Sequence, residues 1–221
     1  MAAAKFLTSA SDPSGFLRPD EPEVAFVGRS NSGKSSAINA ITGVRKLARV
    51  SKTPGRTQLI NFFEAGPGRR IVDLPGYGFA QVTPDVRKRW RSLLDGYLQG
   101  RPNLRGLVVT MDIRRGVTEL DRTMLDWAEA LGLPTLLLLT KADKVSRNEA
   151  ARQRRRVAAE VPATAGVIVF SAQTGQGVDD ARACLDRWFD GASGPDDAAK
   201  EGDEAPAGHK KRPRGGTAGP V

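Results

Sequence analysis

The stretch that decides the fold of this chain reads Gly28-Arg29-Ser30-Asn31-Ser32-Gly33-Lys34-Ser35. It matches the pattern G-x-x-x-x-G-K-[ST], in which a glycine-rich turn surrounds a phosphate group with backbone N–H donors. An apolar run at 24–27 precedes the turn and a helix-compatible run at 36–41 follows it, so a strand leads into a helix N-terminus. We therefore predict a phosphate-binding loop, with Lys34 reaching the β- and γ-phosphates and Ser35 ligating Mg²⁺. The competing interpretation is a glycine-rich strand–helix turn that binds no ligand.

Apolar runs alternate with helical patterns from residue 23 onward, which is typical of an α/β sheet with crossover helices. The expected strands are 24–27, 59–64, 70–73, 106–112, 135–140 and 167–170. The expected helices are 34–41, 84–99, 118–131, 147–161 and 178–190. Only five residues separate the second strand from the third, too few for a parallel crossover, so these two should pair antiparallel. We predict a three-layer α/β domain with about five helices and a six-stranded, mostly parallel sheet that contains one antiparallel strand.

The two ends of the chain differ in composition from the middle. Residues 1–22 contain three prolines and are interpreted as a partly ordered N-terminal extension. Residues 191–221 are rich in Gly, Ala, Pro and Asp without an apolar period, so they cannot bury enough surface to offset the entropy of ordering. We therefore expect one folded domain at 23–190 followed by a disordered, charged tail. The basic segment 210–214 in that tail either contacts RNA or is simply solvated.

Composition excludes several classes of protein. Hydrophobic residues make up 39% of the chain, enough for a sizeable core, and no apolar stretch approaches the roughly 18 residues of a membrane span. The first residues lack the long apolar region of a secretory signal. Cys184 is the single cysteine, and its helix-face spacing favours a buried thiol over a nucleophile. We expect a cytoplasmic protein with no membrane partner.

The formal net charge of +9 belongs to the first 190 residues, because the five acidic and five basic side chains of 191–221 cancel. Basic clusters lie at 87–91, 114–115 and 152–156. A basic folded domain favours a polyanionic partner, for which RNA is the natural candidate. The alternative is that these long side chains only solvate helix faces.

Further motifs indicate that the bound nucleotide is GTP and not ATP. Asp73-Leu74-Pro75-Gly76 has the D-x-x-G form, in which the Asp binds Mg²⁺ through water and the Gly76 N–H meets the γ-phosphate. Thr140-Lys141-Ala142-Asp143 resembles the guanine reader N-K-x-D, with the Lys141 stem over the base. Asp143 can accept two hydrogen bonds from guanine N1–H and N2–H₂, and a site built around such pairing rejects adenine by a large factor.

Two more segments complete the nucleotide site. Phe170-Ser171-Ala172 matches the S-A-x element, whose backbone N–H recognises guanine O6. These motifs follow expected strands, and α/β sheets bind ligands at the carboxyl ends of their strands. The segment 53–58 lies where switch GTPases place a threonine that ligates Mg²⁺ while the γ-phosphate is present. We prefer Thr57 over Thr53 for this role, and a plain Pro54-Gly55 turn is the alternative.

Four longer strings point to a family: GRSNSGKSS at 28–36, SKTPGRTQLINFF at 51–63, DLPGYGFA at 73–80 and TKADK at 140–144. Together they closely resemble the EngB family of ribosome-biogenesis GTP-binding proteins, in the Era-like class of P-loop GTPases. The resemblance covers about residues 5–190 and implies a lone, monomeric GTPase domain that acts in assembly of the large ribosomal subunit. It also implies contact with rRNA and ribosomal proteins, a need for the protein in normal cell division and septation, and Mg²⁺ ligation by Ser35 and Thr57. The tail after 190 extends past the usual end of the family and receives no implied function.

Two residues depart from the general GTPase motifs. Thr140 stands where most GTPases have Asn, although the EngB family resembles this chain in having Thr there. Loss of the Asn amide should remove a bridge to the phosphate loop and weaken the affinity for the nucleotide. Tyr77 follows the D-x-x-G motif where Ras-type enzymes place a glutamine that orients water, so intrinsic turnover should be slow.

We expect Mg²⁺-dependent hydrolysis of GTP to GDP by in-line attack of water, with Lys34 and the loop amides neutralising the developing charge. In Era-like enzymes an Asn at the position of Asn31 helps to hold a potassium ion (K⁺) that replaces an arginine finger. Asn31 either does so here or only braces the loop with a hydrogen bond. Stimulation by a ribosomal particle is the other expected accelerator.

The expected site therefore has three groups of residues. The expected nucleotide contacts are Gly28, Arg29, Ser30, Asn31, Ser32, Gly33, Lys34, Ser35, Gly55, Arg56, Thr57, Gln58, Leu59, Asp73, Leu74, Pro75, Gly76, Thr140, Lys141, Ala142, Asp143, Phe170, Ser171 and Ala172. The expected catalytic residues are Lys34, Thr57, Gly76 and Asn31. The expected Mg²⁺ ligands are Ser35, Thr57 and Asp73.

Three competing functions stay open at this point. The first is a non-hydrolytic guanine-nucleotide switch whose output is binding of RNA or the ribosome. The second is a small-molecule kinase that uses ATP, against which Asp143 argues. The third is a basic RNA-binding module with a vestigial nucleotide site.

Overall fold

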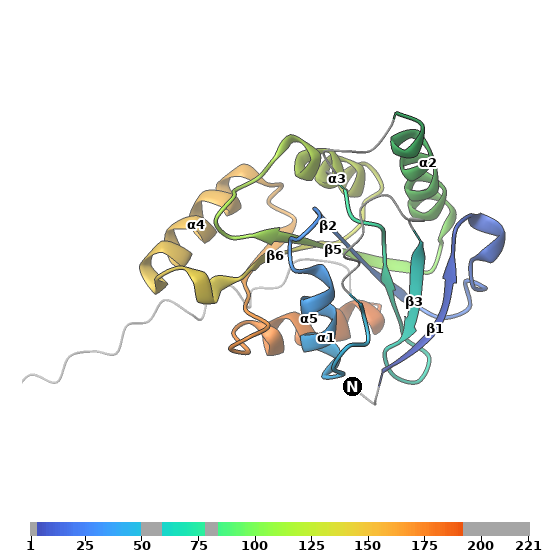
Figure 1. The fold of residues 1–221 in the computed structure, drawn as a ribbon, viewed down its shortest axis with the longest axis horizontal. Coiled ribbons are helices and arrows are strands. Elements are labelled where there is room, and N and C mark those ends of the chain that lie inside the picture. The colour runs from blue at the N-terminus through green and yellow to red at the C-terminus, as the bar shows by residue number, and fades with distance from the viewer. Residues whose placement is uncertain (1–3, 50–58, 78–83, 192–221) are drawn as a thin grey trace, which may run out of the picture.

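Seven strands form one mixed sheet within residues 4–49, 59–77 and 84–191, which are the residues that the computed structural model describes (Figure 1). The strands are β1 (Lys5–Ala10), β2 (Glu23–Gly28), β3 (Ile60–Glu64), β4 (Arg70–Asp73), β5 (Leu104–Asp112), β6 (Thr135–Thr140) and β7 (Ala165–Val169). Their order across the sheet is β1-β3-β4-β2-β5-β6-β7. β3 runs antiparallel to both of its neighbours, and the other pairs are parallel. The prediction of one antiparallel strand in a mostly parallel sheet is confirmed.

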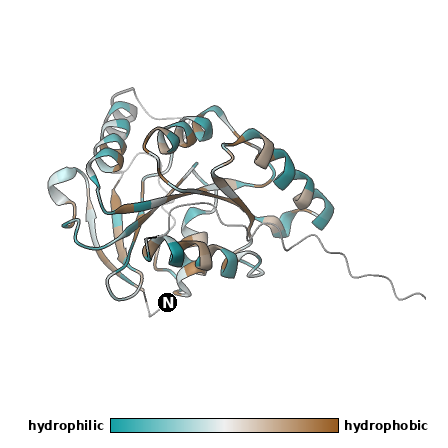
Figure 2. Cartoon of the chain, turned by 180° about the vertical axis from the view of Figure 1, so that it is seen from behind, coloured by the Kyte–Doolittle hydropathy of each residue, from teal (hydrophilic) through white to brown (hydrophobic). Residues whose placement is uncertain are grey.

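Helices cover both faces of the sheet, so the predicted three-layer arrangement is confirmed (Figure 1). They are α1 (Lys34–Thr42), α2 (Pro84–Gly100), α3 (Glu119–Ala130), α4 (Arg147–Glu160) and α5 (Val178–Phe189), with short 3₁₀ turns η1 (Pro13–Gly15) and η2 (Ala142–Lys144). Val24 and Phe26 of β2 pack with α1 and α5, whereas Ala25 and Val27 belong to the core on the side of α2, α3 and α4. This alternation follows from the two-residue period of a strand that is buried on both faces. Figure 2 shows the strands as the hydrophobic centre between helices with hydrophilic outer faces.

The sheet has one strand more than the six that we predicted, so that prediction is wrong. β1 lies at the edge of the sheet and pairs with β3 from Lys5 opposite Glu64 to Ala10 opposite Ile60. Its sequence, KFLTSA, contains no continuous apolar run, because an edge strand with a partly exposed surface needs few apolar side chains. The sheet therefore begins before residue 23, where we expected the folded domain to start.

The other strands and the five helices lie where the sequence predicts them, with ends shifted by two residues or fewer. Capping residues explain this agreement. Thr118 and Asp121 form a capping box at the start of α3, and the Ser146 hydroxyl accepts a hydrogen bond from the Glu149 N–H at the start of α4. Such signals are local in the sequence, so they are visible without knowledge of the tertiary structure.

A buried ion pair closes the amino end of the sheet. Glu23, at the start of β2, is fully buried and pairs with Arg101. The Tyr97 hydroxyl donates to the same carboxylate at 2.7 Å, and Arg101 also donates to the Leu17 carbonyl at 2.6 Å. A buried charge needs several such partners to offset the loss of water. This cluster ties the chain before β2 to α2 and leaves the opposite, carboxyl end of the sheet for ligands.

The expected tail at 191–221 lies outside the described residues apart from Gly191, so its disorder stays a prediction. Among the helices of the described part of the chain, none is both long and apolar enough to cross a membrane.

Candidate nucleotide-binding site

The carboxyl ends of the parallel strands bring the predicted motifs to one edge of the sheet (Figure 1). The strand ends there are Gly28 of β2, Asp73 of β4, Asp112 of β5, Thr140 of β6 and Val169 of β7. The register places Gly28 opposite Thr110 and Asp112 opposite Thr140. The phosphate loop, the D-x-x-G segment and the guanine reader therefore meet, as the α/β pattern predicts.

The phosphate loop is held against β5 by contacts that only glycine permits. A Cβ atom at Gly28 would lie 2.1 Å from the Thr110 hydroxyl oxygen and 2.6 Å from that of Ser32. These two hydroxyls are hydrogen-bonded at 2.7 Å. Gly33, with a φ of 93°, and Asn31, with a φ of 62°, both adopt the left-handed conformation. The loop therefore keeps a tightly curved backbone that leads directly into the N-terminus of α1, an arrangement suited to an anion.

Lys34 on α1 and Asp73 at the end of β4 form an ion pair in which the side chains are 14% and 8% exposed. The Asn61 amide of β3 donates to Asp73 at 3.5 Å and accepts a hydrogen bond from the Ser9 hydroxyl of β1 at 2.6 Å. Sequence reasoning did not place Asn61 in the site. The available signal was a polar side chain within the mainly apolar strand INFFE.

The D-x-x-G segment is joined to the phosphate loop through its backbone. The Tyr77 N–H donates to the Gly28 carbonyl at 3.2 Å, and the Ser30 N–H donates to the Tyr77 carbonyl at 2.9 Å. A Cβ atom at Gly76 would lie 3.1 Å from the Gly28 carbonyl oxygen, a tight contact. The two phosphate-binding segments are therefore adjacent.

The Tyr77 side chain is directed into the core. It is 2% exposed, and its hydroxyl donates to Asp121 at the first turn of α3. Burial, together with the charge of Asp121, raises the pKa of the Tyr77 hydroxyl far above its ordinary value. Tyr77 thus lies in the position of the Ras-type glutamine in the sequence, but its hydroxyl is engaged by α3.

The contacts of the Thr140 hydroxyl differ from what the sequence led us to expect. We expected that a Thr in place of Asn would remove the bridge between the guanine reader and the phosphate loop. Instead the Thr140 hydroxyl donates to the Ser32 carbonyl and lies 2.9 Å from the Met111 carbonyl. The Thr side chain is shorter than that of Asn, but Thr140 is buried directly against the loop. Gly33 permits this close approach, because a Cβ atom on residue 33 would lie only 3.3 Å from Thr140. The bridge is therefore retained by a different chemical group.

Asp143 is held as a charged acceptor. Its Oδ1 accepts a hydrogen bond from the Ser171 hydroxyl at 2.8 Å, and Lys144 Nζ lies 3.1 Å from its Oδ2. The Ser171 hydrogen bond, followed by that of Lys144, lowers the pKa of Asp143 below its ordinary value. A carboxylate in this state is a hydrogen-bond acceptor only, as pairing with guanine N1–H and N2–H₂ requires.

The S-A-x element lies next to this carboxylate. Phe170 is buried, and its carbonyl accepts from the Ala142 N–H at 3.1 Å, which joins the two segments. The Ser171 N–H donates to the Gln176 carbonyl at 3.0 Å and is therefore already used. Ala172, the next residue, is exposed, and its contact with a base stays a prediction.

Part of the predicted site lies outside the described residues. This applies to Gly55, Arg56, Thr57 and Gln58, whose contacts stay predictions. Leu59 is described and half-buried. The Ser35 hydroxyl is described as well, and it donates to the Arg49 carbonyl at 3.4 Å.

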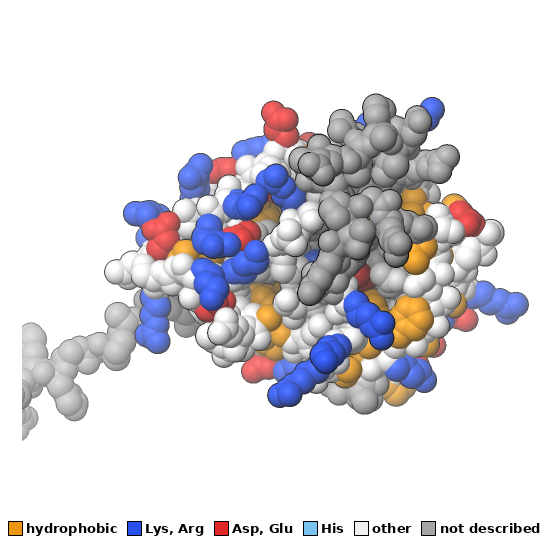
Figure 3. Space-filling model, in the orientation of Figure 1, with side chains coloured by type: hydrophobic (Ala, Val, Ile, Leu, Met, Phe, Trp, Pro, Cys, Tyr) orange, Lys and Arg blue, Asp and Glu red, His pale blue; other side chains and the backbone are white. Residues whose placement is uncertain are grey.

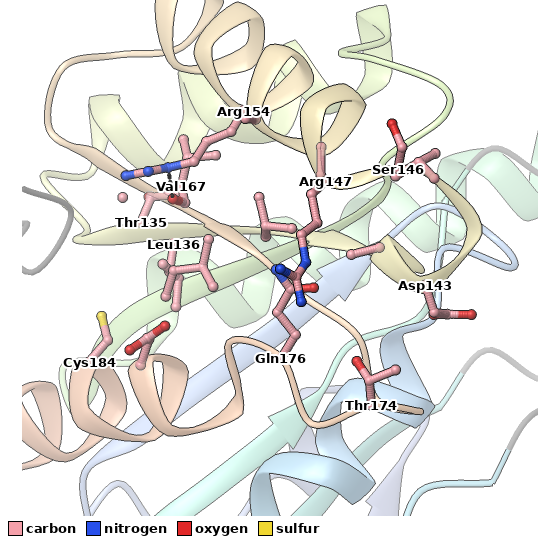
Figure 4. A pocket seen from close by; sticks show the side chains of 18 of the residues that line it. Thr135, Leu136, Asp143, Ser146, Arg147, Arg154, Val167, Thr174, Gln176 and Cys184 are labelled. Carbon is pink, nitrogen blue, oxygen red and sulfur yellow. Dashed lines mark hydrogen bonds between the residues drawn. The ribbon is translucent and has the colours of Figure 1, made fainter. Parts of the chain in front are cut away.

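A cavity of about 840 Å³ lies behind the guanine reader, between α4 and α5 at the edge strand β7. Figure 4 shows Asp143 and Thr174 at one end of this cavity and Cys184 at the other. Arg154 reaches across from α4, and its Nε donates to the Val167 carbonyl at 3.3 Å. This contact gives the Val167 carbonyl of the edge strand a hydrogen-bond donor from α4. Cys184 is buried, as the sequence predicts.

Comparison with known proteins agrees with this geometry. Residues 23–141 match the family model described as "50S ribosome-binding GTPase". A probable GTP-binding protein EngB from Coxiella burnetii is 48% identical over 190 residues, which cover 84% of this chain and 92% of that protein. The chain belongs to the EngB family. An EngB protein from Sodalis glossinidius is 49% identical over 187 residues, covering 83% of this chain and 89% of the relative.

Solved structures show the same fold. A crystal structure of a probable GTP-binding protein EngB superposes with a TM-score of 0.60 at 24% identity, covering 76% of this chain and 98% of that one. Era in complex with MgGDPNP and a segment of 16S ribosomal RNA gives a TM-score of 0.59 at 20% identity, covering 79% of this chain and 57% of Era. This EngB protein is thus a P-loop GTPase of the Era-like class, which binds guanine nucleotides and hydrolyses GTP.

Replacement of Thr140 by Val tests the bridge in this EngB protein. Val keeps the shape but leaves the Ser32 carbonyl without its donor, so we expect a loss of about 1–2 kcal/mol and roughly a tenfold rise in the Kd for GDP. The Kd is measured by displacement of a fluorescent GDP analogue. Thr135→Val is the matched control, because Thr135 lies at the other end of β6 and donates to the Leu133 carbonyl at 3.0 Å. Equal Kd values for both variants would contradict the proposed bridge.

Replacement of Asp143 by Asn tests base recognition. The amide presents a donor to the 2-amino group of guanine, so we expect GTP affinity to fall roughly 100-fold and XTP, which has a 2-oxo group, to gain. A competition titration with both nucleotides measures the preference. Asp126→Asn, an exposed position on α3, serves as control. An unchanged preference for GTP would remove Asp143 from the guanine site.

Proposed function

We propose that this EngB protein is an Mg²⁺-dependent, slowly hydrolysing GTPase that acts as a switch in assembly of the large ribosomal subunit. The observation that carries the proposal is the match of residues 23–141 to the family described as "50S ribosome-binding GTPase", together with the convergence of the guanine and phosphate motifs at one sheet edge. We further propose a cytoplasmic monomer that is needed for normal cell division, on the strength of its membership of the EngB family.

In this proposal the phosphate groups of GTP are bound by the loop amides, the N-terminus of α1 and Lys34. Lys34 and Asp73 form an ion pair in the structure, and a bound γ-phosphate would compete with Asp73 for the ammonium group. Gly76 packs against the loop, where a Cβ atom would lie 3.1 Å from the Gly28 carbonyl oxygen, and its N–H would meet the same phosphate group. Together these donors neutralise the charge that develops as water attacks in line.

The residues present fit an Mg²⁺ ion. Ser35 and Asp73 supply hard oxygen ligands of the kind that Mg²⁺ prefers, and the buried Asp73 carboxylate already requires a cation beside it. Thr57 would add the third protein ligand. When bound, Mg²⁺ would neutralise charge on the β- and γ-phosphate oxygens.

Slow intrinsic turnover follows from the position of Tyr77. The Tyr77 hydroxyl is hydrogen-bonded to Asp121 in the core, so it does not orient an attacking water as the Ras-type glutamine does. A ribosomal particle or K⁺ would therefore be needed to accelerate the reaction. Asn31, in its left-handed conformation in the phosphate loop, is the proposed contact for K⁺.

The K⁺ proposal predicts faster single-turnover hydrolysis in KCl than in NaCl of equal ionic strength, by roughly tenfold or more, because the cation supplies positive charge to the transition state. Asn31→Ala should remove the difference. Equal rates of the wild-type protein in the two salts would leave Asn31 with a bracing role only.

Basic side chains on α4 support an RNA partner. This helix carries five arginines and two glutamates, and only Ala150 and Val157 are buried. Arg147 and Arg155 are exposed and form no ion pair with another described residue. Figure 3 shows many Lys and Arg side chains on the half of the molecule where α4 lies. Exposed arginines of this kind bind phosphate groups of RNA without reading sequence.

Sedimentation with ribosomal subunits tests the proposal. We expect the protein to co-sediment with the large subunit in the presence of a non-hydrolysable GTP analogue, and less in GDP. The Arg147→Glu/Arg155→Glu variant should bind the subunit at least about tenfold more weakly, because two phosphate contacts are lost. The slope of log K against log salt concentration should become shallower by about 2, since about two fewer counterions are released on binding. Arg105→Glu, at the start of β5, is the control. Binding that is independent of the nucleotide, or absent, would contradict the switch.

A further inference from the structure

Asp112 has an unusual position at the end of β5. Its side chain is 3% exposed, yet it contacts two cations that come from different segments. Arg114 Nη2 lies 2.7 Å from Oδ2 and Arg114 Nε lies 2.9 Å from Oδ1, while Lys141 Nζ lies 2.9 Å from Oδ2. Asp112 belongs to none of the GTPase motifs identified in the sequence, and it faces the guanine reader because β5 and β6 are paired at this point.

Lys141 is fixed at both of its ends. Its backbone has a φ of 60°, a left-handed conformation that costs free energy for a residue with a Cβ atom. Its ammonium group donates to the Asn31 carbonyl of the phosphate loop at 2.7 Å and pairs with Asp112. A free lysine side chain loses rotamer entropy when it is fixed, so a lysine that is already fixed gives a pre-organised surface.

We infer that Asp112 is a positioning residue for guanine-nucleotide binding, which acts by holding Lys141 between the base and the phosphate loop. The inference rests on the proposed placement of the guanine base against the Lys141 stem. With its ammonium bound by Asp112 and Asn31, the methylene chain of Lys141 forms one wall of the base subsite before the nucleotide arrives. The same contact keeps the Asn31 carbonyl in place.

The charge of Asp112 is constant under assay conditions. The Arg114 hydrogen bonds, and then that of Lys141, hold the pKa of the Asp112 carboxyl well below its usual range. The ion pair with Lys141 is therefore complete at neutral pH. The Lys141 side chain is about one-third exposed, so water would partly replace Asp112 as the partner of its ammonium group if Asp112 were substituted.

A double-mutant cycle tests whether Asp112 acts through Lys141. The variants are Asp112→Asn, Lys141→Met and the combination, and the readouts are the Kd and dissociation rate of a fluorescent GDP analogue. We expect each single variant to raise the Kd about tenfold, mainly through faster dissociation, and the combination to cost no more than Lys141→Met alone. Independent effects that multiply to about 100-fold would overturn the inference, as would an unchanged Kd in Asp112→Asn.

Two controls separate positioning from general stability. Asp179→Asn removes an exposed carboxylate on α5 that pairs with Arg182, and should leave the Kd unchanged. Arg114→Met removes the other cation of Asp112 and leaves the contact with Lys141, so the Kd should stay within about threefold of wild type. If Asp112→Asn does not fold, the other two single variants still test the inference. A tenfold rise in the Kd of Arg114→Met, together with an unchanged Kd of Lys141→Met, would assign Asp112 a structural role only. Ribosome binding enters none of these readouts, so failure of the assembly proposal would not affect them.

Discussion

The fixation of Ser32 by two threonines is the interaction on which the rest of the site depends. Thr110 of β5 bonds to the Ser32 hydroxyl, and Thr140 of β6 donates to the Ser32 carbonyl. At the first contact Gly28 has no space for a Cβ atom, and at the second a Cβ atom on Gly33 would lie 3.3 Å from Thr140. The curvature of the phosphate loop is therefore imposed by two neighbouring strands, and it does not depend on the loop sequence alone.

Charges at this edge follow one pattern, in which a lysine of a nucleotide motif pairs with an aspartate at a strand end. Lys34 pairs with Asp73 of β4, and Lys141 pairs with Asp112 of β5. Both carboxylates are buried, so each needs a cation to offset the loss of water. The arrangement gives a site rich in positive groups for phosphate without leaving those groups unpaired in the fold. It also links the base end and the phosphate end, because Lys141 donates to the loop carbonyl of Asn31.

Tyr77 connects this edge to the helical layer. Its backbone is bonded to the phosphate loop on both sides, and its hydroxyl is bonded to Asp121 of α3. Asp121 in turn accepts hydrogen bonds from the Thr118 N–H and hydroxyl, which cap the same helix. The residue that follows the D-x-x-G motif thus packs into the core through its side chain and joins the phosphate loop through its backbone. At the opposite end of the sheet, Glu23 and Arg101 provide the anchoring contacts.

Sequence alone determined the elements whose signals are local: the phosphate loop, the parallel strands, the capped helices and the order of the GTPase motifs. It also placed Asp143 and Ser171 after expected strands, whereas their contact depends on the pairing of β6 with β7 in the folded sheet. Tertiary structure decided the rest. β1 could not be predicted because its polar sequence becomes a strand only by pairing with β3, some fifty residues later. The Thr140 bridge and the Asp112 contact to Lys141 likewise depend on distances across the sheet. The spacing of residues along the chain does not encode these distances, because a hydrogen bond or ion pair forms or fails within a few tenths of an ångström.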